Sequence, residues 1–155
     1  MSLRNYHLES YKTSDMPSKT VGRIFLEVEN RELMGAAVCV GPVDTLDHSL
    51  RDALEPVHPW LRKITLSDYR VRVLNPESGA AARVRVFVTY TDHENTWDTV
   101  GVHENIVEAS WQALLDSIEY YYNTVVLDQD QAATPAGTTP ATAAAAAVTA
   151  GAAAR

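Results

Sequence analysis

Two stretches of the sequence, GPVDTLDHSLRDAL at residues 41–54 and NIVEASWQALLDSI at residues 105–118, decide the fold. They match at a separation of 64 residues, so that Leu54 takes the same place in the first stretch as Ile118 in the second. In both, apolar residues recur every three or four positions, which predicts an amphipathic helix. The chain therefore contains the same predicted helix twice. The two apolar stripes consist of Val43, Leu46, Leu50 and Leu54 and of Val107, Trp111, Leu114, Ile118 and Tyr121.

Shorter matches precede each predicted helix. LESYK at residues 8–12 resembles LSDYR at residues 66–70, 58 positions later, and RIFLEV at residues 23–28 resembles RVRVFV at residues 83–88, 60 positions later. Small loop insertions explain the growing separation, and residues 91–95 are the expected place of one. Alternating apolar and polar residues in these segments predict half-buried β-strands. Each repeated unit thus has the predicted order β-β-β-α.

The fold class follows from the one-sided patterns of the strands and helices. We expect an α+β fold of two βββα units related by a pseudo-twofold axis, with antiparallel sheet covered by helices on one face. The third strand of each unit is expected to carry its apolar face on Ala36, Val38 and Val40 in the first unit and on Val100 and Val102 in the second.

Composition sets the domain boundary and excludes several partners. Residues 1–127 are the predicted domain, because 13 of the 28 residues in 128–155 are Ala, and a segment so poor in large apolar residues is expected to be disordered. The net charge of −7 argues against binding to nucleic acid or to an anionic membrane. With no long apolar run and no signal-peptide pattern, we expect a cytoplasmic protein.

Both predicted helices begin with residues that suit a helix N-terminus. Gly41 precedes Pro42, and Asn105 is a good N-cap. Asp44 and Glu108 fall in the first turns, where capping and the helix dipole explain an acidic residue. The free N–H groups of such a helix start also suit the carboxylate of an amino acid. In that case Asp44 or Glu104 would hold the ammonium group, and Val43, Val71 and Val102 would line an aliphatic pocket.

Catalytic and metal-binding motifs give no signal. The five histidines form no HxH or HExxH pattern, and Cys39 is the single cysteine. The sequence has no GxSxG elbow and no GxGxxG or phosphate-binding loop. We therefore predict no metal, no cofactor and no catalytic residues, and we expect His48 to face solvent in the middle of its helix.

Several of these stretches resemble one protein family. GPVDTLD followed by LRDAL in residues 41–54, LSDYRVRVL at residues 66–74, and WDTVGV followed by NIVEASWQAL in residues 97–114 are similar to the C-terminal regulatory domain of 2-isopropylmalate synthase and citramalate synthase. The pattern EASW-x-AL-x-DS at residues 108–117 is nearer the citramalate synthase branch.

The resemblance implies a homodimer of two βββα units per chain and feedback sensing of a branched-chain amino acid, leucine or isoleucine. It also implies a catalytic TIM-barrel domain, in cis or in trans, without which this chain would not be an enzyme. His103 and Glu104 replace the small residues that relatives often carry. A structural dimerisation module that binds no effector is the alternative. The implied effector-binding residues are Gly41, Pro42, Val43, Asp44, Leu66, Tyr69, Val71, Val102 and Glu104.

Overall fold

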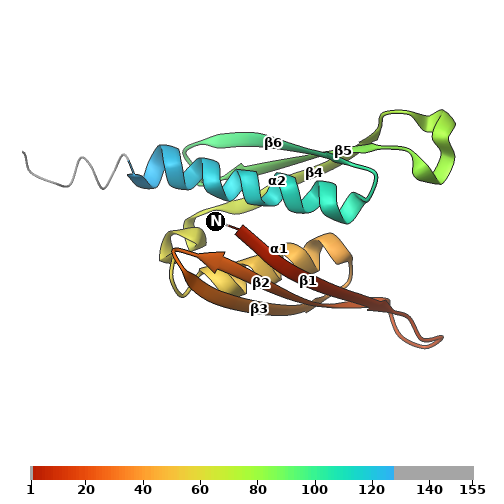
Figure 1. The fold of residues 1–155 in the computed structure, drawn as a ribbon, viewed down its shortest axis with the longest axis horizontal. Helices are drawn as coiled ribbons and strands as arrows, with labels where there is room; N and C mark the ends of the chain where they lie inside the picture. Colours follow the sequence, from red (N-terminus) through yellow and green to blue (C-terminus); the bar gives the residue numbers. More distant parts are fainter. Residues whose placement is uncertain (1, 128–155) are drawn as a thin grey trace, which may run out of the picture.

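The computed structural model describes residues 2–127 (Figure 1). The predicted tail, residues 128–155, lies outside the described residues. The predicted order β-β-β-α is confirmed in both units. The first unit contains β1 (Ser2–Tyr11), β2 (Lys19–Val28), β3 (Arg31–Cys39) and α1 (Pro42–Leu54), and η1 (Pro59–Lys63) leads to the second. The second contains β4 (Thr65–Val73), η2 (Pro76–Ala81), β5 (Val84–Thr91), β6 (Thr96–His103) and α2 (Ile106–Tyr121), followed by η3 (Tyr122–Val126).

The strands form two separate antiparallel sheets, in the orders β1-β2-β3 and β4-β5-β6. Figure 1 shows the two sheets on opposite sides of the molecule, with α1 and α2 between them. Side chains from both sheets and both helices join in one apolar core. The predicted α+β architecture with helices on one face of each sheet is therefore confirmed.

The strand register shows that equivalent residues of the two units are separated by an almost constant number of positions in the sequence. A β-bulge interrupts β1 between Leu3 and Asn5, and another interrupts β4 before Asp68, which lies 63 residues after Asn5. The N-caps of the two helices, Gly41 and Asn105, are 64 residues apart. The separations of 58 and 60 predicted from the shorter matches are therefore wrong.

The expected insertion at residues 91–95 is also absent. Glu27 pairs with Glu32 in the first unit, and Thr91 pairs with Thr96 in the second, so both strands of the hairpin keep the separation of 64. The sequence matches were misleading because alternate positions along a strand carry similar residues, and a shift of a few positions still aligns like with like.

The apolar faces predicted for β3 and β6 point away from the helices. Val38 and Val40 are 60% and 68% exposed, and Val100 is 42% exposed. The helix-facing positions hold Gly35 and Gly101 instead, because the helices lie very close to these strands. A Cβ atom on Gly35 would lie 2.0 Å from the Ser49 carbonyl oxygen, and one on Gly101 would lie 1.8 Å from that of Ala109.

A buried polar network joins the two units. The Tyr90 hydroxyl of β5 donates a hydrogen bond of 2.5 Å to the carboxylate of Asp47 in α1. Arg51, one turn further along α1, pairs with Asp47 at 3.1 Å and also donates to the carbonyl oxygens of Leu61 and Ile64 in the connection. The first helix is thus tied both to the connecting segment and to the second sheet.

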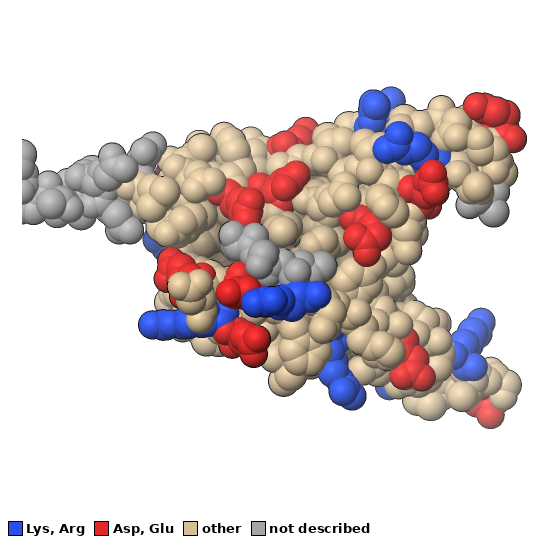
Figure 2. Space-filling view, viewed as in Figure 1, with Lys and Arg blue, Asp and Glu red and all other residues tan. Residues whose placement is uncertain are grey.

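Two properties of the described surface bear on partners. Basic and acidic side chains alternate over the face in Figure 2 rather than gathering by sign. Within residues 2–127, no helix combines the length and the apolar character that a membrane span requires.

Candidate functional site

The start of α1 lies where the sequence places it. Gly41 is the N-cap and Pro42 the first helical residue, and no side chain caps this end of the helix. Thr45 turns inward and donates to the Gly41 carbonyl oxygen at 2.7 Å. Asp44 projects outward with 55% of its side chain exposed. This helix start therefore offers a solvent-accessible acidic side chain, which lies 3.1 Å from the imidazole of His48.

A groove of about 440 Å³ runs between α1 and the beginning of β4. It brings together Asp44 and Leu66, two of the residues implied for effector binding. Its chemistry suits a small zwitterion with an apolar side chain, because carboxylates, guanidinium groups and aliphatic side chains share its walls. The lining residues are Asp44, Asp47, His48, Arg51, Glu55, Arg62, Ile64, Thr65 and Leu66.

Tyr69, in β4, faces away from that groove and contacts α2, the helix of its own unit. It is opposite the buried Val88 in the sheet, and its hydroxyl lies 3.0 Å from the Ser110 hydroxyl of α2. Val71 is opposite the buried Val86, so it lies on the same face of β4 as Tyr69, but it is 38% exposed because β4 is an edge strand of its sheet.

Val102 lies on the other face of the same sheet. It pairs with Arg85, and both residues alternate with buried neighbours that face α2. Glu104 is exposed in the connection between β6 and α2. A single pocket within one chain that contains Val43, Tyr69 and Val102, as the sequence suggests, is therefore not formed, since Tyr69 and Val102 are on opposite faces of one sheet.

The start of α2 is closed by contacts that α1 lacks. Asn105 caps the helix by accepting a hydrogen bond of 2.8 Å from the Val107 N–H. The Tyr6 hydroxyl, from β1 of the first unit, donates to the Glu108 carboxylate. Partial burial and the neighbouring Glu108 raise the pKa of Tyr6 to about 12. The ring of Tyr6 also stacks on Trp111, with centroids 6.4 Å apart.

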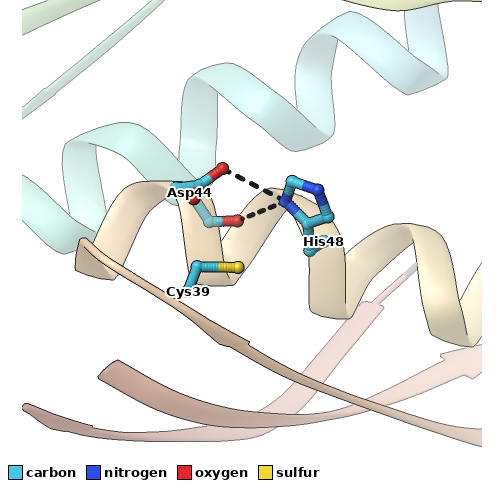
Figure 3. Close-up of side chains that lie close together, drawn as sticks. All are labelled: Cys39, Asp44 and His48. Carbon is cyan, nitrogen blue, oxygen red and sulfur yellow. Dashed lines mark hydrogen bonds and ion pairs between the residues drawn. The ribbon is translucent and has the colours of Figure 1, made fainter. Parts of the chain in front are cut away.

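The structure also assembles a cluster that the motif search missed. The ligand atoms of Cys39, Asp44 and His48 all lie within 4.8 Å of one another (Figure 3). His48 Nδ1 lies 2.9 Å from the backbone oxygen of Asp44 and 3.1 Å from its carboxylate. Burial, and then Asp44, raises the pKa of the Cys39 thiol. The available signal was an Asp and a His four residues apart on a predicted helix, with a Cys shortly before it.

An aromatic pocket of about 310 Å³ lies at the opposite end of the helices. Trp60 and Tyr122 stack in its wall with centroids 5.9 Å apart, and His58 lies against both rings. Partial burial lowers the pKa of His58. The sequence has three consecutive tyrosines at residues 120–122, where α2 ends, but only the fold shows that Tyr122 meets Trp60.

Comparison with known proteins assigns the family. Over 95 residues the chain is 48% identical to an (R)-citramalate synthase of Aquifex aeolicus, which covers 61% of this chain and 18% of the relative. It is 43% identical over 113 residues to the (R)-citramalate synthase of Geobacter sulfurreducens, with coverage of 73% and 21%. The match to that of Streptomyces coelicolor is 38% over 123 residues, with coverage of 76% and 23%.

The chain thus spans about a fifth of the length of these curated relatives. Residues 1–122 match the family described as the LeuA allosteric (dimerisation) domain. That match covers almost all of the folded units described above. The chain therefore belongs to the LeuA allosteric (dimerisation) domain family.

Proposed function

We propose that this chain binds isoleucine or leucine and transmits its presence, as a feedback signal, to a catalytic domain of the citramalate synthase type. The observation that carries the proposal is the family match over residues 1–122, whose description names allostery and dimerisation. The identity to several (R)-citramalate synthases supports the choice of the parent reaction. The chain itself acts as the regulatory part and catalyses nothing alone.

The groove between α1 and β4 is the proposed effector site. The Asp44 carboxylate suits the ammonium group of the amino acid, and Leu66 suits its branched side chain. Burying such a side chain contributes about 1.5–3 kcal/mol. Charge-assisted contacts to the two ionised groups supply the remainder of the about 6 kcal/mol that binding at tens of micromolar requires.

Dimerisation is proposed to bury a helix-free sheet face. In the first unit, Phe25, Met34 and Val38 expose apolar side chains on that face, with Met34 60% exposed. Val102 lies on the corresponding face of the second sheet, opposite Arg85, so a dimer that buries this face in both units would cover it. Replacing Met34 by Glu should then convert a dimer into a monomer in light scattering, while the circular dichroism of the helices stays unchanged.

Calorimetric titration with isoleucine, leucine and valine tests the effector directly. We expect Asp44→Asn to weaken binding at least about tenfold, since a hydrogen bond to a charged group contributes about 1.5–3 kcal/mol. Glu104→Gln is the matched control, because Glu104 is the other carboxylate proposed for the ammonium group. If only Glu104→Gln loses binding, the site is at α2. If the folded parent binds none of the three amino acids, the chain is a structural dimerisation module instead.

A further inference from the structure

The cluster of Cys39, Asp44 and His48 has the composition of a metal site. A thiolate, a carboxylate and an imidazole are together a donor set that Zn²⁺ favours among the abundant divalent ions. With the thiol and the carboxylate ionised and the imidazole neutral, the three ligands carry two negative charges, which balance a divalent cation. A fourth position would remain open to water.

The geometry is close to what such an ion requires. Bonds of about 2.0–2.3 Å in a tetrahedron place neighbouring ligand atoms about 3.3–3.8 Å apart. In the structure His48 Nδ1 and the Asp44 carboxylate are already 3.1 Å apart, and the three ligand atoms lie within 4.8 Å of one another. The side chains of His48 and Asp44 are 58% and 55% exposed, so a small rotation, which also releases His48 Nδ1 from the Asp44 backbone oxygen and frees it to bind an ion, closes the difference without disturbing the core.

The backbone holds these ligands together. Cys39 is the last residue of β3, and only Val40 and Gly41 separate it from α1. Asp44 and His48 are four residues apart on the helix, so their side chains project from the same face. Figure 3 shows the thiol beneath the start of α1, on the side where Asp44 and His48 meet.

The second unit supplies an internal contrast. His103 ends β6 two residues before the N-cap, as Cys39 ends β3, but Gln112 takes the place of His48. In addition, Glu108, the counterpart of Asp44, accepts the hydrogen bond from Tyr6. The same place in the fold is thus a packing contact in one unit and an assembly of three exposed or half-exposed ligands in the other.

We propose that Cys39, Asp44 and His48 bind a thiophilic divalent cation of the Zn²⁺ class at the start of α1. This goes beyond the proposed effector function and does not depend on it. Because Asp44 belongs to both proposed sites, metal binding is to be measured in the absence of amino acids.

Titration of the full, reduced chain with Co²⁺ tests the proposal, because a bound thiolate gives a charge-transfer band in the near ultraviolet. Cys39 is the only cysteine, so the band can arise nowhere else. We expect one Co²⁺ per chain, displacement of Co²⁺ by Zn²⁺, and loss of the band in Cys39→Ser. His48→Ala and Asp44→Ala should each weaken Co²⁺ binding at least about tenfold. Removing a group that only orients a metal ligand already costs about that much, and removing a ligand itself should cost no less.

The matched control is His103→Ala, at the position in the second unit that corresponds to Cys39. It should leave the band and the affinity unchanged. The proposal is overturned if Co²⁺ produces no charge-transfer band. It is also overturned if both His48→Ala and Asp44→Ala bind Co²⁺ as tightly as the parent chain. One ion for every two chains would also overturn it, since the thiols of two copies would then bind the metal without the other two ligands.

Discussion

The two helix starts occupy the same place in the repeated unit and have opposite characters. At α2, Asn105 caps the helix and Glu108 is bound by Tyr6 of the other unit. At α1, Gly41 provides no side-chain cap, and Asp44 remains exposed beside a groove. One helix start therefore helps to hold the two units together, and the other stays exposed to solvent.

The contacts between the units differ in the same way. Asp47 and Trp111 are equivalent positions, each six residues after the N-cap, and each reaches the sheet of the other unit. Asp47 does so through the buried hydrogen bond from Tyr90, and Trp111 through stacking on Tyr6. One attachment is polar and the other aromatic, so the two respond to different substitutions.

The largest loss of stability is expected at the polar attachment. Asp47→Ala leaves Arg51 without its acidic partner, and breaking a buried ion pair costs about 3–5 kcal/mol. Tyr90→Phe removes only the hydroxyl and should lower the free energy of unfolding by about 1–3 kcal/mol. Chemical denaturation measures both. If Asp47→Ala lowers the free energy of unfolding by less than Tyr90→Phe does, this network does not hold the units together.

The next largest losses of stability are expected where the helices lie closest to the sheets. Gly101→Ala places a methyl group against the backbone of α2, and Gly35→Ala does the same beneath α1, so each should cost about 1–3 kcal/mol or more. Gly41→Ala is the control, since nothing lies within 4 Å of its added Cβ, and it should cost less than 1 kcal/mol, roughly the loss of a favourable N-cap. Equal losses at all three glycines would contradict the close packing.

Removing the cap of α2, or adding one to α1, is expected to change the free energy of unfolding by a smaller amount. Asn105→Ala removes the hydrogen bond to the Val107 N–H and should lower the free energy of unfolding by about 1 kcal/mol. Gly41→Asn gives α1 the cap that α2 has, and should raise stability by a few tenths of a kcal/mol, about the usual difference between Gly and Asn at an N-cap. Thermal denaturation of both variants against the parent measures the two changes. If Gly41→Asn lowers stability, the α1 start differs from α2 by more than its missing cap.

The sequence predicted the helices better than the strands. Each helix has a start signal and a stripe of period 3.6, and both Gly41 and Asn105 are the N-caps in the structure. The strands repeat every two residues, so a wrong separation between the units still aligned apolar with apolar. The helix-facing glycines of β3 and β6 gave no hydrophobic signal, and the valines beside them gave a strong signal for the wrong face.

The candidate site was predicted only in its local parts. Gly41 to Asp44 form one helix start, and that could be read from the residues in order. Which distant residues join it depends on the contact between units. Leu66 reaches the α1 groove because β4 begins beside that helix, whereas Tyr69, three residues later, contacts α2. A β-bulge between them shifts the pairing, and no sequence pattern announced it.

The last effect, which is absent at neutral pH and confined to alkaline pH, concerns the closed helix start. The pKa of Tyr6 is about 12 in the folded chain because of partial burial and Glu108, against 10.0 for an ordinary tyrosine. Between these values the unfolded chain loses this proton while the folded chain keeps it, so the free energy of unfolding falls as pH rises from 10 to 12. Below pH 10 both states are protonated and the contribution is fully present. Tyr6→Phe should make this decline shallower, and Glu108→Gln should do so in part, both measured by denaturation at a series of pH values. A decline in Tyr6→Phe as steep as in the parent would assign it to other tyrosines with a raised pKa, such as Tyr90, and would remove Tyr6 from the contacts that make the α2 start different from that of α1.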